Sequence, residues 1–543
     1  MWQSGWRERA WAALDDTWDI IIIGGGITGA GILREATRAG LRALLFEAHD
    51  FAGGTSSRSS KLVHGGFRYL RNAQIRLTYE SVRERERLLK EGRGLVNPLG
   101  CLLVNYQGDE LPAWVFGLGL SLYDILALKW GHRRYDGYDM RALCPALCDT
   151  NLSGGYRYFD AQTDDARLVL RIIQESIQDG GAALNYAPVK NFVYQGGNGK
   201  NSISYPGRRT TVSSIIGVVV SNTDSRSEAR PREVFAPVVI NAAGVWADEI
   251  RQWTGSPPRL RRLRGSHLVI PAQRLPLNRA VNLFHPRDGR PVFAYNWEGV
   301  TIVGTTDVDH DDQLVLDPAI SEAEAAYLLE FIQIAFPGQE ITRSDIQATF
   351  SGIRPVVNTG KVDPSKESRE HVLWIENGML TVTGGKLTTF RLMAREALRL
   401  IRKRLPGNPT FPKNHRLLNP VDREILLSPD VLSSTMRLRL FGRYGSQTPN
   451  LVEAARPGEF ESVEGSAATW AELRWAARSE GALHLDDLLL RRVRLGILLP
   501  EGGLKIMDQI RSIVQPEMNW DDPTWQSELS QYTRLWHDSY SIS

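Results

Sequence analysis

The start of the chain alternates apolar and polar stretches in a strand–helix–strand order. Residues 19–23 are predicted to form the first strand, and their unbroken run of isoleucines after Asp19 predicts burial on both faces of a parallel sheet. The periodic segment 28–39 predicts a helix that ends at Gly40, and the apolar run 41–46 predicts a second strand. Together these segments predict a compact βαβ unit.

The rest of the chain divides into a mixed region and a helical tail. Strand-like runs separated by polar turns over residues 190–235 predict hairpins, and residues 379–401 predict a strand, a glycine turn and a helix. Proline-rich sequence near residue 408 marks a domain boundary. Further helices are predicted over residues 77–91, 164–178, 470–478, 483–495 and 503–514.

Composition changes this picture little. The chain has 543 residues, 42% hydrophobic and 23% charged, with a formal net charge of +3, which is typical of a soluble globular protein with two or three domains. Three cysteines give no disulfide framework and favour a reducing compartment. Cys144 and Cys148 have no neighbouring Cys or His that would complete a metal site, so we predict no metal.

Membrane contact is predicted only at the surface. The first residues are charged and lack the apolar core of a signal peptide, and no stretch reaches the roughly 18 apolar residues of a spanning helix. The longest apolar run, 114–128, carries Asp124 and is followed by Lys129, Arg133 and Arg134, a composition typical of an interfacial segment. A buried core helix explains the same run equally well.

The clearest chemical signal is a glycine motif between the first strand and the first helix. Gly24, Gly26 and Gly29 form a G-x-G-x-x-G pattern, which allows a tight turn, close approach of a pyrophosphate and close helix–strand packing. Glu47 ends the second strand, where a carboxylate can accept ribose hydroxyls and disfavours NADP. The motif predicts a dinucleotide site, but its spacing does not separate FAD from NAD.

Longer motifs resemble one flavoprotein family. GTSSRSSKLVHGGFRYL at 54–70 resembles the signature that follows the dinucleotide fold in FAD-dependent glycerol-3-phosphate dehydrogenases. Val63, Phe67 and Arg264 are conservative departures from the residues usual in that family. The resemblance covers about residues 15–540 and includes YFDAQTDDARLVL at 158–170, VVINAAGVWAD at 238–248, RGSHLVIP at 264–271, VGTTD at 303–307, SGIRPVV at 351–357 and TGGKLTTFR at 383–391.

The resemblance implies both a fold and an activity. The implied fold is α/β, with a glutathione-reductase-like FAD-binding Rossmann domain, an interleaved antiparallel-sheet substrate domain and a C-terminal all-helical domain. The implied activity is oxidation of sn-glycerol 3-phosphate to dihydroxyacetone phosphate, with electrons passing from FAD to a membrane quinone. Residues 1–408 would form the oxidoreductase, with FAD-binding parts at about 18–110, 160–255 and 346–408, substrate-binding parts at about 111–159 and 256–345, and the helical domain at 409–543.

Oxidation of a phosphorylated secondary alcohol requires a base, cations for the phosphate and a hydride acceptor. His64 is the base that we predict, because a neutral imidazole accepts a proton near pH 7. Arg354 is predicted to hold the phosphate, Arg68 either to hold the phosphate as well or to hold the C2 hydroxyl, and Arg369 is a weaker third candidate. Lys386 follows a glycine pair at a predicted helix start, where it is expected to stabilise negative charge on the flavin.

The residues expected to bind FAD gather in the turns of the dinucleotide half. Serines after the second strand and threonines after the GGK turn are hydrogen-bond candidates, although each serves equally well as a cap or turn residue. The predicted set is Gly24, Gly25, Gly26, Thr28, Gly29, Glu47, Ser56, Ser57, Ser60, Ala243, Gly244, Gly385, Lys386, Leu387 and Thr388.

Alternative functions stay open at this point. A glycerol-3-phosphate oxidase that uses oxygen, or another oxidase of the same flavoprotein superfamily such as an amino-acid oxidase, would share much of the site. An RNA-binding or scaffold protein would use the RLRRLR run at 259–264 as a phosphate-backbone patch, but a solvated or lipid-facing surface explains that run more simply.

The expected partners are glycerol 3-phosphate, a quinone and a membrane surface, without nucleic acid. The expected location is cytoplasmic, peripheral on the inner face of the cytoplasmic membrane. Whether the chain forms a homodimer stays open.

Overall fold

The four isoleucines near the start of the chain form the central strand of a parallel sheet. β1 (Ile20–Ile23) pairs in parallel with β2 (Ala43–Phe46) and with β11 (Val239–Asn241), and all three strands are buried. α2 (Ile27–Arg38) connects β1 to β2, which confirms the predicted βαβ unit. The sheet runs in the order β18-β19-β11-β1-β2-β7, and its strands are parallel except at the edge strand β18 (Val372–Glu376), which is antiparallel to β19 (Met379–Thr383); β7 (Ala182–Leu184) is the other edge.

Both faces of this parallel sheet are covered. On one face α2 packs against α7 (Asp165–Gln178) and α10 (Phe390–Leu400), and their buried side chains share a core with β1 and β2. The other face packs against a three-stranded antiparallel sheet, which confirms hairpins in this region. That small sheet consists of β8 (Val189–Tyr194), β9 (Ile215–Val220) and β10 (Arg232–Phe235), with α1 (Trp6–Ala12) beside it.

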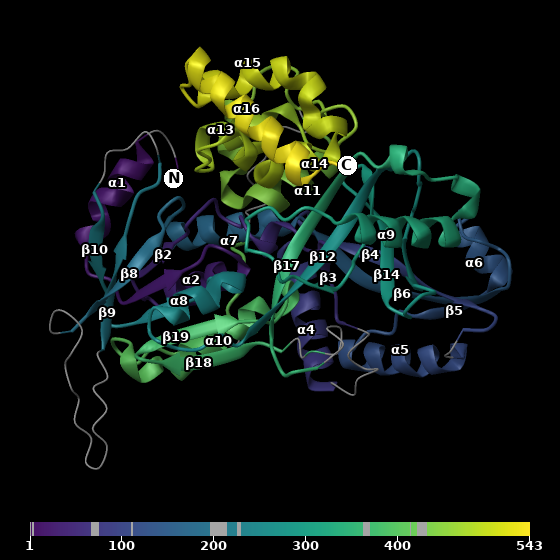
Figure 1. Ribbon diagram of the computed structural model, residues 1–543, viewed down its shortest axis with the longest axis horizontal. Helices are drawn as coiled ribbons and strands as arrows, with labels where there is room; N and C mark the ends of the chain where they lie inside the picture. Colours follow the sequence, from purple (N-terminus) through teal and green to yellow (C-terminus); the bar gives the residue numbers. More distant parts are fainter. Residues whose placement is uncertain are drawn as a thin grey trace, which may run out of the picture.

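A larger, mostly antiparallel sheet forms the second half of the molecule. Its strands run in the order β16-β12-β15-β14-β13-β4-β6-β3, while β17 pairs with β12 and β5 pairs with β6. One face packs against α6 and α9, and the other packs against α5, which lies next to α4 (Figure 1). The helices are α4 (Ile75–Glu91), α5 (Ala113–Ala127), α6 (Gly137–Leu143) and α9 (Glu322–Ala335). The strands are β3 (Leu62–Val63), β4 (Val96–Tyr106), β5 (Arg133–Asp136), β6 (Leu152–Thr163), β12 (Leu260–Pro271), β13 (Ala280–Phe284), β14 (Pro291–Trp297), β15 (Val300–Gly304), β16 (Val308–Asp309) and β17 (Ala348–Val357).

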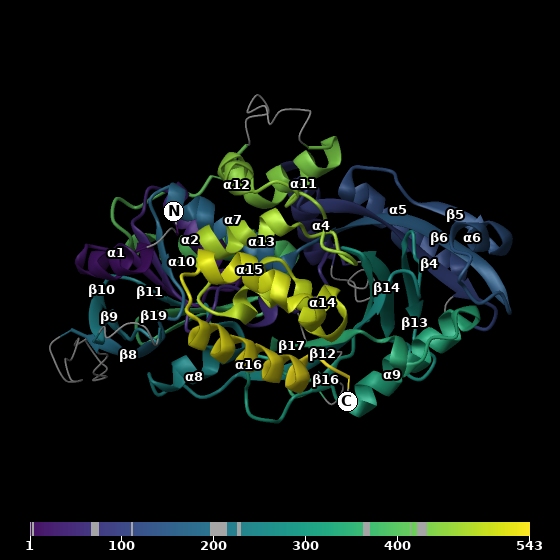
Figure 2. The same ribbon diagram turned by 90° about the horizontal axis from the view of Figure 1, so that it is seen from above.

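The tail folds into a helical domain that lies over both sheets. Seen from above in Figure 2, α13, α15 and α16 lie across the junction of the sheets, and their side chains share a core with β14 and β17. The tail helices are α11 (Ser434–Tyr444), α12 (Thr448–Ala454), α13 (Trp470–Ser479), α14 (Leu495–Leu498), α15 (Met507–Glu517) and α16 (Asp522–Ser539).

Two predicted tail helices differ from the structure. Residues Asp487–Arg492 form a π-helical turn and Arg494 takes a left-handed φ of 66°, so the regular helix predicted over 483–495 is wrong. Buried ion pairs of this segment with the rest of the chain override its helical propensity. The helix predicted over 503–514 begins only at Met507, because positive φ angles interrupt the chain up to Gly503.

The structure is a computed structural model. It describes residues 2, 5–66, 75–109, 112–195, 214–224, 230–361, 367, 370–412, 414–420 and 432–542.

Candidate active site

The glycine turn after β1 is closed against neighbouring backbone. Gly24 has a φ of 112°, and a Cβ on it would lie 2.5 Å from the Ala242 carbonyl oxygen. A Cβ on Gly29 would lie 1.9 Å from the carbonyl oxygen of Gly24. Both positions therefore require glycine. Thr28 and Gly29 lie in the first turn of α2, directly against β1, so the free N–H groups of the helix start face this turn.

Ser56 and Glu47 complete the turn from the second strand and its following loop. Ser56 Oγ accepts the N–H of Ile27 at 2.9 Å, and a Cβ on Gly26 would lie 3.0 Å from that oxygen. The Glu47 carboxylate accepts the N–H of Gly25 at 2.6 Å. Burial raises the pKa of Glu47, and backbone hydrogen bonds oppose the rise. Amides for a pyrophosphate and a carboxylate for a ribose fit a dinucleotide cofactor.

Two further turns lie at the same edge of the sheet, because β11 pairs in parallel with β1 and β19 pairs in parallel with β11. After β11, the Ala243 N–H donates to Asn241 Oδ1 at 3.2 Å, and Gly244 has a φ of 57°. After β19, Gly385 has a φ of 73°, and a Cβ on it would lie 2.4 Å from Met393 Sδ. The structure thus brings these predicted cofactor residues together from separate parts of the chain.

The turn after β3 contains His64 and packs against the segment after β19. Thr388 Oγ1 donates to the His64 carbonyl oxygen at 3.3 Å, and Leu387 and Thr388 form a short helical turn before α10. The Lys386 ammonium donates to Ser81 Oγ of α4 at 3.1 Å. Two residues predicted to be catalytic, His64 and Lys386, therefore lie on adjoining turns.

The backbone beside His64 is held by a buried polar cluster. The Gly65 N–H donates to Tyr123 Oη at 2.9 Å and to Asp160 Oδ1 at 3.2 Å. Arg85 of α4 donates to the same two oxygens at 2.7 and 2.8 Å. A Cβ on Gly65 would lie 2.3 Å from Tyr123 Oη, so only glycine fits. Since Tyr123 belongs to α5, that helix contacts the His64 turn directly.

Arg354 lies on β17 and reaches over β12. Its guanidinium donates to Asp307 Oδ1 and to Thr305 Oγ1, both at 2.9 Å. A Cβ on Gly265 of β12 would lie 2.2 Å from Arg354 Nη2, so the glycine makes room for the guanidinium. A planar, partly exposed guanidinium can hold a phosphate by two hydrogen bonds. Two other predicted site residues lie outside the described residues: Arg68 and Arg369.

A second histidine, His267 on β12, was not among the site residues predicted from the sequence. Its Nε2 atom lies 2.8 Å from Oγ of Ser60, which was predicted to contact the cofactor, and its ring stacks on Phe350 with centroids 4.5 Å apart. A Cβ on Gly304 would lie 2.3 Å from the ring, so glycine leaves space for it. Its Nδ1 is buried without a hydrogen-bond partner in the described part of the chain. The signal was a histidine inside the apolar RGSHLVIP strand, where a buried polar group calls for an explanation.

Two cations influence His267. Burial, followed by the charges of Arg354 and Lys61, lowers the pKa of His267 well below its ordinary value, which keeps the imidazole neutral at pH 7. Lys61 Nζ lies 4.7 Å from the centroid of the Phe350 ring and 3.1 Å from Asp165 Oδ1. Burial lowers the pKa of Lys61 to about 8. Lys61, too, was not among the site residues predicted from the sequence.

The glycine-rich turn at the edge of the parallel sheet fits a dinucleotide, and the polar residues of the second sheet adjoin it. Together the two features are typical of a dinucleotide-dependent oxidoreductase. The family model described as FAD dependent oxidoreductase matches residues 19–395, and the chain belongs to this family, with FAD as its cofactor. A second model, described as the C-terminal domain of alpha-glycerophosphate oxidase, matches residues 405–524. The predicted fold class and the predicted cofactor are confirmed.

Within that class the chain belongs to the FAD-dependent glycerol-3-phosphate dehydrogenase family, as its motifs indicated. It is 32% identical over 505 residues to aerobic glycerol-3-phosphate dehydrogenase from Staphylococcus haemolyticus (strain JCSC1435), covering 88% of this chain and 87% of that relative. The glycerol-3-phosphate dehydrogenase from Bacillus halodurans, solved in complex with FAD, matches with a TM-score of 0.76 and 25% identity over 99% of both chains. L-alpha-glycerophosphate oxidase from Mycoplasma pneumoniae shares the fold, with a TM-score of 0.56 and 18% identity over 75% of this chain and 99% of the oxidase.

Proposed function

We propose that this protein oxidises sn-glycerol 3-phosphate to dihydroxyacetone phosphate. The substrate is supported by the names of its dehydrogenase relatives. The observation that carries the proposal is the pairing of a guanidinium with a neutral imidazole, Arg354 and His267, on the adjacent strands β17 and β12. An alcohol that carries a phosphate needs both an anion-binding group and a proton acceptor.

We assign the base to His267. When bound, FAD accepts the hydride that leaves carbon 2 of the substrate. We assign to the reaction the tautomer of His267 whose Nε2–H donates to Ser60 Oγ, because only in that tautomer is Nδ1 an acceptor for the proton of the C2 hydroxyl. His64, the base predicted from the sequence, stays the alternative, since it lies on the turn that packs against the segment after β19.

We assign the phosphate to Arg354, with Arg68 and Arg369 as further ligands predicted from the sequence. The guanidinium has the planar geometry that suits a two-point contact with phosphate oxygens, which a lysine cannot reproduce. We assign charge stabilisation to Lys386. Its ammonium lies on the turn after β19, at the edge of the parallel sheet where the cofactor would bind, and would offset negative charge on the reduced cofactor.

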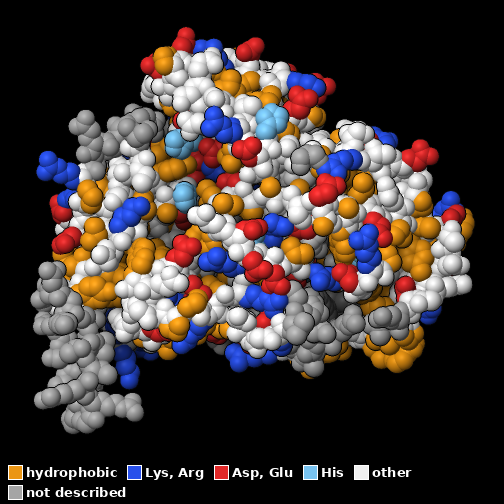
Figure 3. Space-filling view, viewed as in Figure 1, with side chains coloured by type: hydrophobic (Ala, Val, Ile, Leu, Met, Phe, Trp, Pro, Cys, Tyr) orange, Lys and Arg blue, Asp and Glu red, His pale blue; other side chains and the backbone are white. Residues whose placement is uncertain are grey.

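The electron acceptor that we propose is a membrane quinone, reached through α5. One face of this helix is buried, including Phe116 and Leu120, but the other exposes an apolar stripe. Figure 3 shows orange side chains gathered at the lower right, where α5 lies in Figure 1. The stripe consists of Trp114, Leu118, Leu122, Ile125, Leu128 and Trp130, and exposed basic residues follow it at Lys129, Arg133 and Arg134.

Such a stripe with a basic flank suits a helix lying in the headgroup region of an anionic bilayer. Among the described residues no helix is long and apolar enough to cross a membrane. From the exposed stripe and its basic flank we propose a peripheral position on the inner face of the cytoplasmic membrane. One side of α5 packs on the large sheet, as a buried helix would, and membrane contact of the outward side is the part that we propose.

Flavin absorbance tests the function directly. Anaerobic addition of glycerol 3-phosphate to the FAD-loaded protein should bleach the flavin, and a soluble quinone should restore the colour. Absence of bleaching would remove the proposed substrate. Peroxide formation in air at the rate of turnover would instead select the second candidate, a glycerol-3-phosphate oxidase. The match of residues 405–524 to the C-terminal domain of alpha-glycerophosphate oxidase is the reason to test it.

A further inference from the structure

The C-terminal helical domain, residues 409–543 in our division of the chain, contacts the loop that completes the cofactor turn. This loop runs from Asp50 to Lys61 and carries Ser56, whose hydroxyl accepts the N–H of Ile27 at the start of α2. The tail helices lie above α2 and α7 in Figure 1, on the side from which the following three contacts come.

The first contact holds the beginning of the loop. Both oxygens of the Asp50 carboxylate accept hydrogen bonds from Arg492, at 2.6 and 2.8 Å, and Arg491 adds a third at 2.7 Å. All three side chains are almost completely buried. If Asp50 moved, the buried Arg492 guanidinium would lose its carboxylate partner, whereas Arg491 would keep Asp486 and Asp487, so Arg492 is the residue that fixes this end of the loop.

The second contact holds the backbone next to Ser56. Arg494 Nη2 donates to the Ser57 carbonyl oxygen at 2.9 Å and forms an ion pair with Asp165 at the start of α7. Lys61 donates to the same carbonyl oxygen at 3.0 Å. The Ser57 hydroxyl, predicted to contact the cofactor, donates back to Gly54 at 3.3 Å. The peptide between Ser57 and Arg58, one residue beyond Ser56, is therefore held by Arg494 of the tail together with Lys61.

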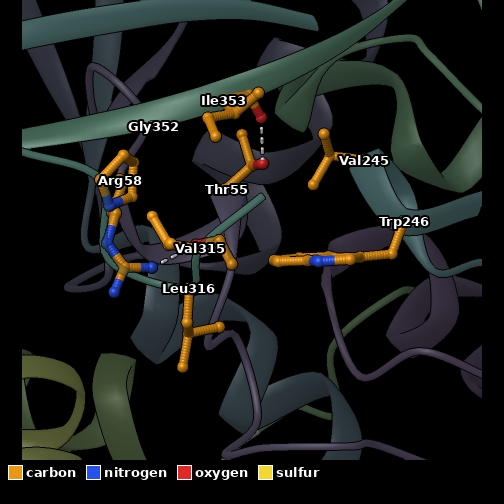
Figure 4. A pocket seen from close by; sticks show the side chains of 10 residues that line it. Thr55, Arg58, Val245, Trp246, Val315, Leu316, Gly352 and Ile353 are labelled. Atoms are coloured by element: carbon orange, nitrogen blue, oxygen red, sulfur yellow. Dashed lines mark hydrogen bonds between the residues drawn. The ribbon is translucent and has the colours of Figure 1, made fainter. Parts of the chain in front are cut away.

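The third contact lies at Arg58. Tyr540, close to the end of the chain, accepts a hydrogen bond from the Arg58 guanidinium at 3.0 Å and donates to Asp317 at 2.6 Å. Arg58 in turn donates to the Gly54 carbonyl oxygen at 3.0 Å. Figure 4 shows Arg58 beside Thr55, whose hydroxyl bonds to the Ile353 carbonyl oxygen of β17.

One of these contacts, at Asp50, precedes Ser56 in the loop, and the other two, at Ser57 and Arg58, follow it. We infer that Arg492, Arg494 and Tyr540 are positioning residues for FAD: they hold the loop 50–61 so that Ser56 stays against the N-terminus of α2. A tail that only stabilised the fold would contribute to the stability of the cofactor-free protein but not to the affinity for FAD. The inference rests on the α2 turn being the cofactor site, and it extends the proposed function by assigning a task to the C-terminal domain.

The test compares two loop-contact variants with a matched control. Tyr540→Phe removes one hydroxyl and keeps the ring, and Arg494→Met removes the guanidinium that holds Ser57. The control is Arg439→Met, which breaks another contact between the tail and the large sheet, with Glu298 at 2.5 Å. The dissociation constant of FAD is measured by fluorescence titration of deflavinated protein, and thermal unfolding of the same deflavinated samples is followed in parallel.

We expect Tyr540→Phe and Arg494→Met to raise the dissociation constant about ten-fold or more, the effect of one lost charge-assisted hydrogen bond, and Arg439→Met to leave it near the wild-type value. Wild-type affinity in both loop variants overturns the inference, as does equal weakening by the control. If Arg494→Met does not fold, Tyr540→Phe decides alone. This titration contains no substrate, so its result does not depend on whether the protein oxidises glycerol 3-phosphate. That activity is tested separately by flavin bleaching.

Discussion

The cofactor turn and the substrate site are built from the chain in opposite ways. In the turn, Glu47 contacts Gly25 only 22 residues away and Gly29 packs on the carbonyl oxygen of Gly24, although Gly24 itself also packs on the distant Ala242. In the substrate site, Ser60 meets His267 across 207 residues. Local contacts leave a short motif in the sequence, whereas contacts between distant strands leave single residues that become meaningful only when the sheet is known.

The largest effect is expected where the turn has no spare space. In Gly29→Ala the new methyl group would lie 1.9 Å from the Gly24 carbonyl oxygen, and such overpacking costs about 1–3 kcal/mol or more. The variant should purify without FAD and unfold at a lower temperature. Gly338→Ala is the control, because a Cβ there meets nothing within 4 Å. A Gly29→Ala protein with full FAD content and unchanged melting would show that the turn is not tightly closed.

The next largest effect is expected in the substrate site. His267→Gln should lower kcat/KM by about 100- to 10,000-fold, the usual contribution of general acid–base catalysis, while FAD stays bound. Because a base works when neutral and the pKa of His267 is lowered, wild-type kcat/KM should fall only as the pH drops below His267's ordinary range, about 6.5. If His64→Gln removes the acidic limb of the pH profile and His267→Gln preserves it, His64 is the base.

The same contrast explains what the sequence could and could not predict. The strand, turn and helix around Gly24 follow from local patterning, and the family motifs point to Arg354. His267 was overlooked because its role depends on Phe350 and Ser60, which only the pairing of β12 with β17 and the path of the loop after β2 bring near. The tail departs from its predicted helix at Asp487–Arg492 because distant carboxylates pair with its arginines.

A smaller effect is expected from the cofactor carboxylate. Glu47→Ala removes a group positioned for the ribose, and each lost charge-assisted hydrogen bond should weaken FAD binding by about 1.5–3 kcal/mol. Because the N–H groups of Gly25 and His49 lose their acceptor, the cofactor-free protein should also unfold at a somewhat lower temperature while it still folds. Retention of all FAD after extensive dialysis would argue against the assignment of Glu47.

The smallest effect on catalysis is expected from the apolar stripe of α5. The double variant Leu118→Asp and Ile125→Asp should lose sedimentation with anionic vesicles, because each buried apolar side chain contributes about 1.5–3 kcal/mol to partitioning. Turnover with a soluble dye should stay at the wild-type level. Ile375→Asp is the control, an exposed apolar residue on β18 in the other sheet. Vesicle binding that survives the double variant would move the membrane contact elsewhere.

The central claim is that Arg354 recognises a phosphate while the rest of the site oxidises the adjoining alcohol. Flavin bleaching by glycerol 3-phosphate and by glycerol, followed anaerobically in wild type and in Arg354→Gln, tests it most directly. We expect the variant to lose about 2–5 kcal/mol of transition-state binding for glycerol 3-phosphate and to oxidise glycerol at the slow wild-type rate. If both substrates slow by the same factor, Arg354 supports the reacting carbon or the fold, and the phosphate assignment is wrong.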